Sequence, residues 1–217
     1  MNDPVFEGVY GPYSIDSTDR REVLLYRLSL LLAAIAQLAL LGQWQLQGPA
    51  LLWPWLLLLA VGIGLALQWI HIYLRPLHGA LKLMWLVGSL GAGALAVVAG
   101  PSGMAQALGE QRLWLLAIGP LFAALCGIGF KEFFCFRRPE AIGVTLLLPL
   151  ALLGYLLGLL DPRLSTGLLA VESVLLLVLC LRKFPMPAAA DVGDKSVFAH
   201  LESLRQKDQT PLGGEAI

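Results

Sequence analysis

The sequence is short of charge. Only 14% of its 217 residues are Asp, Glu, Lys or Arg, whereas 58% are hydrophobic, and the mean hydropathy is +0.75. Soluble domains carry roughly 25% charged residues, because a water-facing surface needs polar groups. The shortage excludes a disordered chain, a nucleic-acid-binding protein and an ordinary soluble enzyme, and it indicates that most of the surface lies in lipid. The net charge is zero, so no strongly charged partner is implied.

Familiar functional motifs are also missing. The chain has no glycine-rich phosphate loop, GxSxG, HExxH or EF-hand pattern, and no hydrophobic run carries the charge series of a voltage sensor. The cysteines are three, an odd number, and they lie in or next to hydrophobic runs, so we expect free thiols at Cys126, Cys135 and Cys180. We expect no cleavable signal peptide, because polar and acidic residues precede the first apolar run.

Long apolar runs dominate what is present. A helix that crosses the hydrocarbon core of a bilayer needs about 20 mostly apolar residues. The runs are unbroken rather than alternating, which excludes strands, and open sheets cannot lie in lipid. The sequence therefore predicts an all-α bundle of six transmembrane helices. They are expected at about Val23–Leu41, Leu51–Ile72, Ala80–Ala99, Leu113–Phe130, Ile142–Leu160 and Gly167–Leu181.

The basic residues divide unequally between the two sides of this bundle, which predicts its orientation. Thirteen of the 15 fall on the side of the termini and of the second and fourth loops, and two, Arg112 and Arg163, fall on the other. Basic residues collect on the cytoplasmic side of membrane proteins. Both termini are therefore expected in the cytoplasm, or in the stroma of a plastid. The thirteen are Arg20, Arg21, Arg27, Arg75, Lys82, Lys131, Arg137, Arg138, Arg182, Lys183, Lys195, Arg205 and Lys207.

We expect three parts: a cytoplasmic N-terminal flap over residues 1–22, the six-helix transmembrane domain over 23–181 and a cytoplasmic tail over 182–217. In the flap, β-forming residues around Gly11-Pro12 predict a small hairpin or an extended segment, and the stretch 16–19 predicts a helix N-cap.

In the tail, Asp194 or Ser196 is expected to cap a short helix that ends near Lys207. Its apolar stripe would cover the protein's own loops, a partner or the lipid headgroups. The stripe consists of Val197, Leu201 and Leu204, widened by Phe198.

Glu172 is the one charged residue well inside a predicted span. A carboxylate at that depth costs about 2.5–3.5 kcal/mol on insertion scales, so it normally faces a cavity or a partner. The residue is either a protonated acid that hydrogen-bonds a neighbouring helix, or a functional group such as a proton relay or a ligand-binding carboxylate.

Two histidines mark the inner ends of the second and third predicted spans. His71 and His78 are seven residues apart and would share a helix face, but Pro76 is expected to turn the chain between them. Either side chain suits a metal or a tetrapyrrole pigment, and histidines at such depths also bond carbonyls or headgroups.

The fourth span ends in a further polar cluster on the same side. Glu132 and Cys135 lie at the depth of His71 and His78, so a metal or pigment site of these four residues is one hypothesis. Cys126 and Cys135 are nine residues apart, which is no zinc or haem-attachment spacing. The alternative is that Lys131 and Glu132 pair with charges on neighbouring loops.

Small residues at four-residue spacing predict close helix packing. They occur as Gly88-x-x-x-Ala92 and Ser89-x-x-x-Gly93 in the third span and as Gly154-x-x-x-Gly158 in the fifth. Packing within the bundle is favoured over homodimerisation, and the oligomeric state stays open.

Several stretches resemble landmarks of an integral-membrane domain family of unknown function, found mainly in cyanobacteria with relatives in plastids. The resemblance extends from about residue 7 to 204 and implies a multi-pass protein of photosynthetic cells, in the thylakoid or plasma membrane. It implies no activity or cofactor, so no catalytic residue is transferred. The stretches are Val9–Ile15, Ile70–His78, Gly129–Phe136 and Val192–Phe198.

Three functions are consistent with these features. The leading hypothesis is a non-enzymatic accessory or assembly factor that binds a membrane complex through its flap and its tail helix. The second is a metal- or pigment-binding membrane protein, which includes an enzyme, that uses His71, His78, Glu132 and Cys135. The third is a small transporter with Glu172 as its buried acid.

Overall fold

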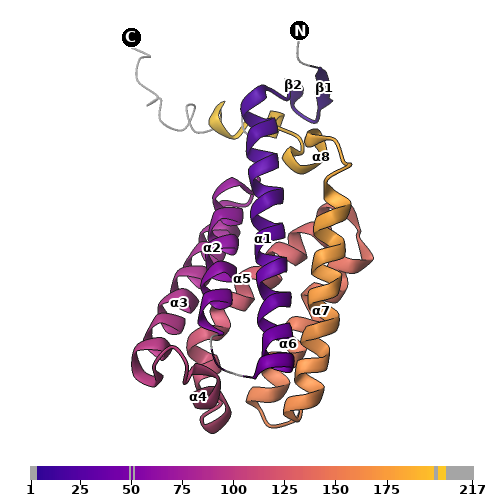
Figure 1. Ribbon diagram of the computed structural model, residues 1–217. Coiled ribbons are helices and arrows are strands. Elements are labelled where there is room, and N and C mark those ends of the chain that lie inside the picture. Colours follow the sequence, from indigo (N-terminus) through magenta and orange to yellow (C-terminus); the bar gives the residue numbers. More distant parts are fainter. Residues whose placement is uncertain (1–3, 49, 51, 198–199, 204–217) are drawn as a thin grey trace, which may run out of the picture.

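The computed structural model describes residues 4–48, 50, 52–197 and 200–203. A two-stranded hairpin precedes an all-α bundle whose long helices run between two ends (Figure 1). We call the end that carries β1, β2 and α8 the hairpin end, and the end near α4 the opposite end. The elements are β1 Val5–Gly8, β2 Gly11–Ser14, α1 Ser17–Gln47, α2 Trp53–Trp69, α3 Arg75–Ala99, α4 Met104–Glu110, α5 Trp114–Phe136, α6 Pro139–Leu156, α7 Pro162–Lys183 and α8 Ala188–Val192.

The predicted helical membrane bundle is confirmed, with one helix shorter than expected. Five helices, α1, α3, α5, α6 and α7, are long and apolar enough to cross a membrane. Helix α2 has 17 residues and a length of about 25 Å. It ends there because the backbone adopts an extended conformation at Ile70, five residues before α3 begins at Arg75. Helix α1 is longer than its apolar run, since Asp16 and Asp19 form a capping box that starts it six residues before Val23.

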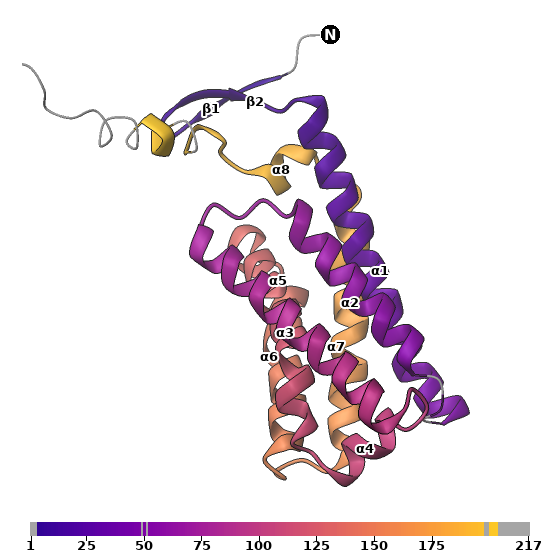
Figure 2. The ribbon, with the colours of Figure 1, turned by 90° about the vertical axis from the view of Figure 1, so that its left-hand side faces the viewer.

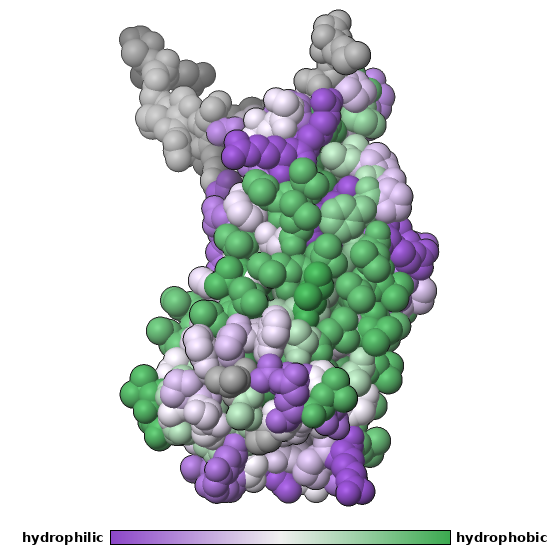
Figure 3. All heavy atoms as spheres, in the orientation of Figure 1, coloured by the Kyte–Doolittle hydropathy of each residue, from purple (hydrophilic) through white to green (hydrophobic). Residues whose placement is uncertain are grey.

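The helices pack so that α1 lies between α2 and α7, while α5 contacts α3 and α6. Helices α2 and α3 are consecutive but touch sparsely, and they diverge in Figure 2. On the face that Figure 3 shows, hydrophobic side chains form a belt across the middle and hydrophilic ones lie towards both ends. Such a belt suits a surface that faces the hydrocarbon of a bilayer.

Two small residues mediate contacts between helices: Gly88, which belongs to a predicted motif, and Gly62 of α2. A Cβ atom at Gly88 of α3 would lie 2.0 Å from the backbone nitrogen of Leu121 in α5, and one at Gly62 of α2 would lie 2.8 Å from that of Ala33 in α1. At Gly93 nothing lies within 4 Å. Gly88 and Gly62 therefore serve packing within the bundle, as the sequence favoured.

We expect Gly88→Ala to lower the free energy of unfolding by about 1–3 kcal/mol, because the new methyl group must push the backbones of α3 and α5 apart. Gly93→Ala on the same helix is the matched control, and it should leave stability unchanged or raise it by up to about 1 kcal/mol. Unfolding titrations in mixed micelles measure both. Equal losses for the two variants would contradict the packing role of Gly88.

The hairpin and residues 184–197 form a cap over the hairpin end of the bundle (Figure 2). The expected hairpin forms, with its turn at Val9 and Tyr10 rather than at Gly11-Pro12. Its turn is fastened to the tail, because Val9 N donates to Asp194 Oδ2 at 2.7 Å and Tyr10 N to Ser196 Oγ at 3.0 Å. Hydrogen bonds from Ser196 and from Val9 N lower the pKa of Asp194, so the carboxylate stays charged near neutral pH.

The tail differs from the expectation in one respect and agrees in another. Helix α8 was not predicted, and it packs Val192 against Ile15 and Val23 in a small core under the hairpin. Helical residues begin again at Ser196, whose backbone N–H bonds Asp194 Oδ1, as the predicted cap requires. Phe198, Leu204 and Lys207 lie outside the described residues.

Candidate functional site

The buried acid of the last span meets a polar partner on the first long helix. Glu172 and Ser173 of α7 are fully buried, and Gln37 of α1 is 3% exposed. Gln37 Nε2 donates to Glu172 Oε2 and, at 2.8 Å, to Ser173 Oγ. Ser173 Oγ in turn donates to the carbonyl of Leu169 at 2.7 Å. A polar pair between α1 and α7 therefore lies inside the apolar bundle, where unpaired groups are expensive.

The polar pair is short of hydrogen-bond donors. Among the described residues, neither Gln37 Oε1 nor Glu172 Oε1 has a hydrogen-bond partner, although both atoms are buried. Buried polar atoms are rarely left unpaired, and these two are both acceptors when the carboxyl group is ionised. The pair can therefore be completed by a proton on Glu172 or by a ligand that brings N–H groups.

A cavity of about 280 Å³ lies near the opposite end of the bundle, between α1, α2, α4, α5, α6 and α7. Its walls are mainly apolar and include four aromatic rings, which suit the body of an amphiphilic molecule. The four rings belong to Trp44, Trp53, Phe122 and Tyr155, and the lining also includes Leu41 and Leu169.

The cavity and the polar pair lie along the same helix faces. On α1, Leu41 and Trp44 follow Gln37 by four and seven residues, and on α7, Leu169 precedes Glu172 by three. Residues at these spacings share one face of a helix, with about 5.4 Å between turns. Gln37 and Glu172 do not line the cavity, but each lies about one helical turn from a lining residue, Leu41 and Leu169 respectively.

The hairpin end holds a second buried polar group, an ion cluster of five charges. The carboxylates of Glu132 in α5 and Asp191 in α8 are joined by the ammonium of Lys183, at the end of α7, which lies 2.5 Å from Glu132 Oε2 and also bonds Asp191. Arg27 of α1 holds Asp191 through Nε at 2.8 Å, and Lys131 lies 3.3 Å from Glu132 Oε1.

Further contacts lock the ion cluster in place. Tyr26 donates its hydroxyl to Glu132 Oε1 at 2.6 Å, and Arg27 also donates to the carbonyls of Met186 and Pro187. The ammonium of Lys183 lies 4.6 Å from the centre of the Phe136 ring, a cation–π contact. Helices α1, α5, α7 and α8 are thereby tied together, so the cluster closes the hairpin end of the bundle.

The four residues of the proposed metal or pigment site do not converge. Within the described part of the chain, no group of three or more His, Cys, Asp or Glu side chains could hold a metal ion. Glu132 belongs to the ion cluster, so the alternative expected for Lys131 and Glu132 is closer to the structure. The two residues pair with each other, and Glu132 also pairs with Lys183, which ends a helix rather than lying in a loop. Cys135 is an exposed free thiol.

Both histidines bond neighbours within the protein. His78 Nε2 lies 2.7 Å from the carbonyl oxygen of Leu67, so α3 is fastened to α2. His71 Nε2 lies 3.3 Å from Glu22 of α1. Burial lowers the pKa of His71 more than Glu22 raises it, so the ring is neutral at pH 7. The two histidines thus connect α2, α3 and α1.

Sequence comparison agrees with this architecture. A family model described as "Uncharacterized integral membrane protein (DUF2301)" matches residues 65–200. The chain belongs to this family. A relative in Haemophilus influenzae, described as an uncharacterized protein, is 29% identical over 188 residues, which is 85% of this chain and 94% of the relative. This relative comes from neither a cyanobacterium nor a plastid. No solved structure matches the chain.

In this DUF2301 protein the family match includes Glu132, Glu172, Lys183 and Asp191, while Gln37 precedes it. Sequence reasoning had singled out Glu172 and Glu132 but missed Gln37 and Asp191. A signal for Gln37 existed, since an amide inside an apolar run is unusual. Nothing comparable pointed to Asp191, which follows the last span among prolines and alanines.

Proposed function

We propose that this protein exchanges a small amphiphilic cation for a proton across the membrane, with Gln37 and Glu172 as the polar end of the binding site. The proposal is carried by the two buried acceptor oxygens that lack a partner among the described residues, one of them on an acid. It corresponds to the transporter hypothesis raised by the sequence, and it now includes a class of substrate.

The shortage of hydrogen-bond donors at Gln37 and Glu172 is the physical reason why binding of the cation would be coupled to release of the proton. A proton on Glu172 neutralises the site and supplies one donor, and an organic cation with N–H groups supplies charge and donors together. Both cannot occupy the same carboxylate. Binding of the cation therefore releases the proton, and in one cycle the cation crosses the membrane in one direction and the proton in the other.

The cavity supports the amphiphilic part of the proposal. Its apolar and aromatic walls suit the body of the cation, and aromatic faces attract positive charge. Leu41 and Leu169 line the cavity about one helical turn from Gln37 and Glu172, so the cation's polar head would pass them to reach the acid. The ion cluster ties the helices together at the other end, which supports access to the polar pair from the side of the cavity.

We further propose that the hairpin end faces the cytoplasm or stroma, in a plasma or thylakoid membrane. The unequal division of the basic residues supports this orientation. The cation would then approach the cavity from outside the cell or from the thylakoid lumen.

The accessory role has less support. It depended on the flap and the tail as elements that grip a partner, and in the structure these elements bind each other through Val9, Tyr10, Asp194 and Ser196. We therefore favour exchange, and a membrane complex remains the weaker proposal.

Proteoliposomes that contain a pH-sensitive dye test the function. Benzylguanidinium is the probe, because its planar N–H groups can reach two acceptors and it stays charged at neutral pH. Added outside, it should enter as protons leave, so the lumen becomes alkaline faster than in protein-free liposomes. Benzylurea, of the same shape but neutral, should give no response. A wild-type response no faster than that of protein-free liposomes, or an equal response to benzylurea, would overturn the proposal.

A further inference from the structure

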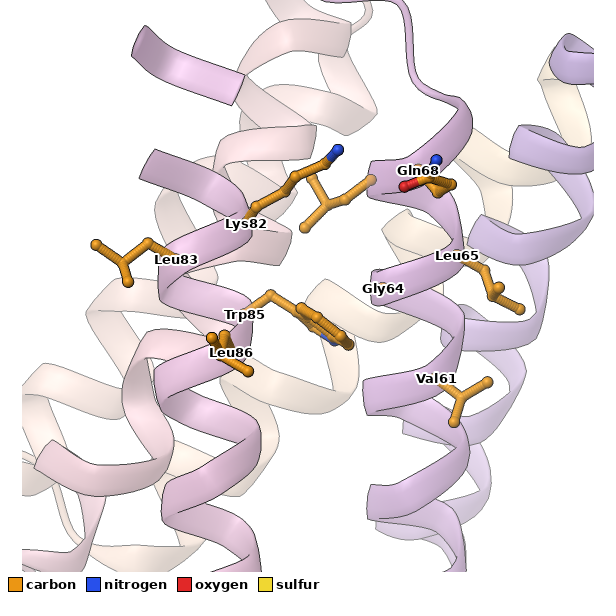
Figure 4. Close-up of a pocket in the computed structure, with 9 residues that line it drawn as sticks. Val61, Gly64, Leu65, Gln68, Lys82, Leu83, Trp85 and Leu86 are labelled. Carbon is orange, nitrogen blue, oxygen red and sulfur yellow. The ribbon is translucent and has the colours of Figure 1, made fainter. Parts of the chain in front are cut away.

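A groove on the surface between α2 and α3 is separate from the cavity and from the ion cluster. Figure 4 shows it where the two helices diverge. Its volume is about 590 Å³ and its walls are almost entirely apolar. They include Val61, Gly64 and Gln68 of α2 and Lys82, Trp85 and Leu86 of α3.

The floor of the groove is a fixed aromatic ring. Trp85 reaches across from α3, and its indole N–H donates to the carbonyl of Ala60 in α2 at 2.7 Å. A Cβ atom at Gly64 would lie 2.5 Å from the ring, so glycine is needed for the ring to lie there (Figure 4). The ring of Trp85 is thus held in the groove by a specific hydrogen bond.

The groove becomes polar towards the hairpin end. Lys82 extends from α3 towards α2, with Gln68 at the same level across the groove (Figure 4). Arg75, His78 and Lys82 recur at spacings of three and four, so they follow one face of α3 down to the groove. In the described part of the chain no acidic side chain pairs with Arg75 or Lys82, unlike the lysines of the ion cluster.

We infer that this groove binds an anionic phospholipid from the leaflet at the hairpin end. The acyl chain lies along the apolar walls over Trp85, and the phosphate is bound by Lys82, with Arg75 nearer the aqueous phase. The charges are complementary, because two basic side chains without acidic partners lie where the lipid headgroup must be. The inference does not depend on the proposed exchange of cations.

Lipid titration of the full-length protein in a mild non-ionic detergent tests the site, with bound lipid counted by native mass spectrometry. Phosphatidylglycerol should bind more tightly than phosphatidylcholine, and inorganic phosphate should not compete. Lys82→Gln should weaken phosphatidylglycerol about fivefold and leave phosphatidylcholine unchanged. Arg163→Gln removes an exposed charge at the opposite end and should change neither. Val61→Trp, which fills the groove, should weaken both lipids.

Equal affinity of wild type and Lys82→Gln for phosphatidylglycerol would overturn the inference. Full binding by Val61→Trp would do so as well, since the lipid would then lie elsewhere. Competition by inorganic phosphate would indicate a site for soluble anions instead. The secondary structure of each variant, from circular dichroism, distinguishes lost binding from lost folding.

Discussion

Glu172→Gln is expected to abolish the exchange of benzylguanidinium for protons and to leave the bundle folded. Glutamine preserves the shape and the hydrogen bond to Gln37 but has no proton to release and no charge to offer the cation. Lumenal alkalisation should fall to that of protein-free liposomes. The variant should be at least as stable as wild type, because an amide is cheaper than an acid at this depth.

Glu110→Gln is the matched control for this substitution. Glu110 is the last residue of α4, is exposed, and bonds Gln106. The same chemical change there should leave the exchange rate at the wild-type value. Exchange by Glu172→Gln at the wild-type rate would show that the buried acid is a structural group, even if the protein transports.

Glu132→Gln is expected to be the most damaging single change in the ion cluster, with a loss of about 3–5 kcal/mol in the free energy of unfolding. The wild-type cluster holds three cations and two acids. Without Glu132, one acid remains against three buried cations. Lys183→Gln leaves two of each, so it should cost less although Lys183 touches both acids.

Denaturant titrations in mixed micelles measure the free energy of unfolding of each variant and so show which substitution costs more. Arg182→Gln is the control, because Arg182 pairs with Glu140 but is half exposed, and such pairs contribute about 1 kcal/mol or less. If Lys183→Gln were the more damaging of the two buried variants, bridging rather than charge balance would govern the cluster. If neither exceeded the control, the cluster would not fasten the hairpin end.

The architecture was predictable because lipid imposes a simple rule on the chain. Each span must be helical and mostly apolar, so unbroken runs located the bundle, and Glu172 stood out as an acid within one. The hairpin and the Asp16 cap were also readable, since β-forming and capping residues act locally. The short helix α2 was not, because apolar residues continue to Ile72 while the helix ends at Trp69.

The sequence did not predict which residues form each site, because the depth of a residue in the membrane does not determine which way its side chain points from the helix. The sequence predicts one depth for His71, His78, Glu132 and Cys135, yet only Glu132 belongs to the ion cluster, and its partner Lys183 comes 51 residues later. Gln37 and Glu172 are 135 residues apart and meet only because α1 packs on α7. The cavity depends on how six helices pack, and no single run records that.

Proton release during binding tests the central claim most directly. Benzylguanidinium is titrated into purified protein in weakly buffered detergent, and released protons are counted against bound cation at several pH values. The account predicts that each bound cation displaces a proton wherever Glu172 is protonated, and that Glu172→Gln releases none. Binding to the wild type that releases no proton at any pH would contradict it.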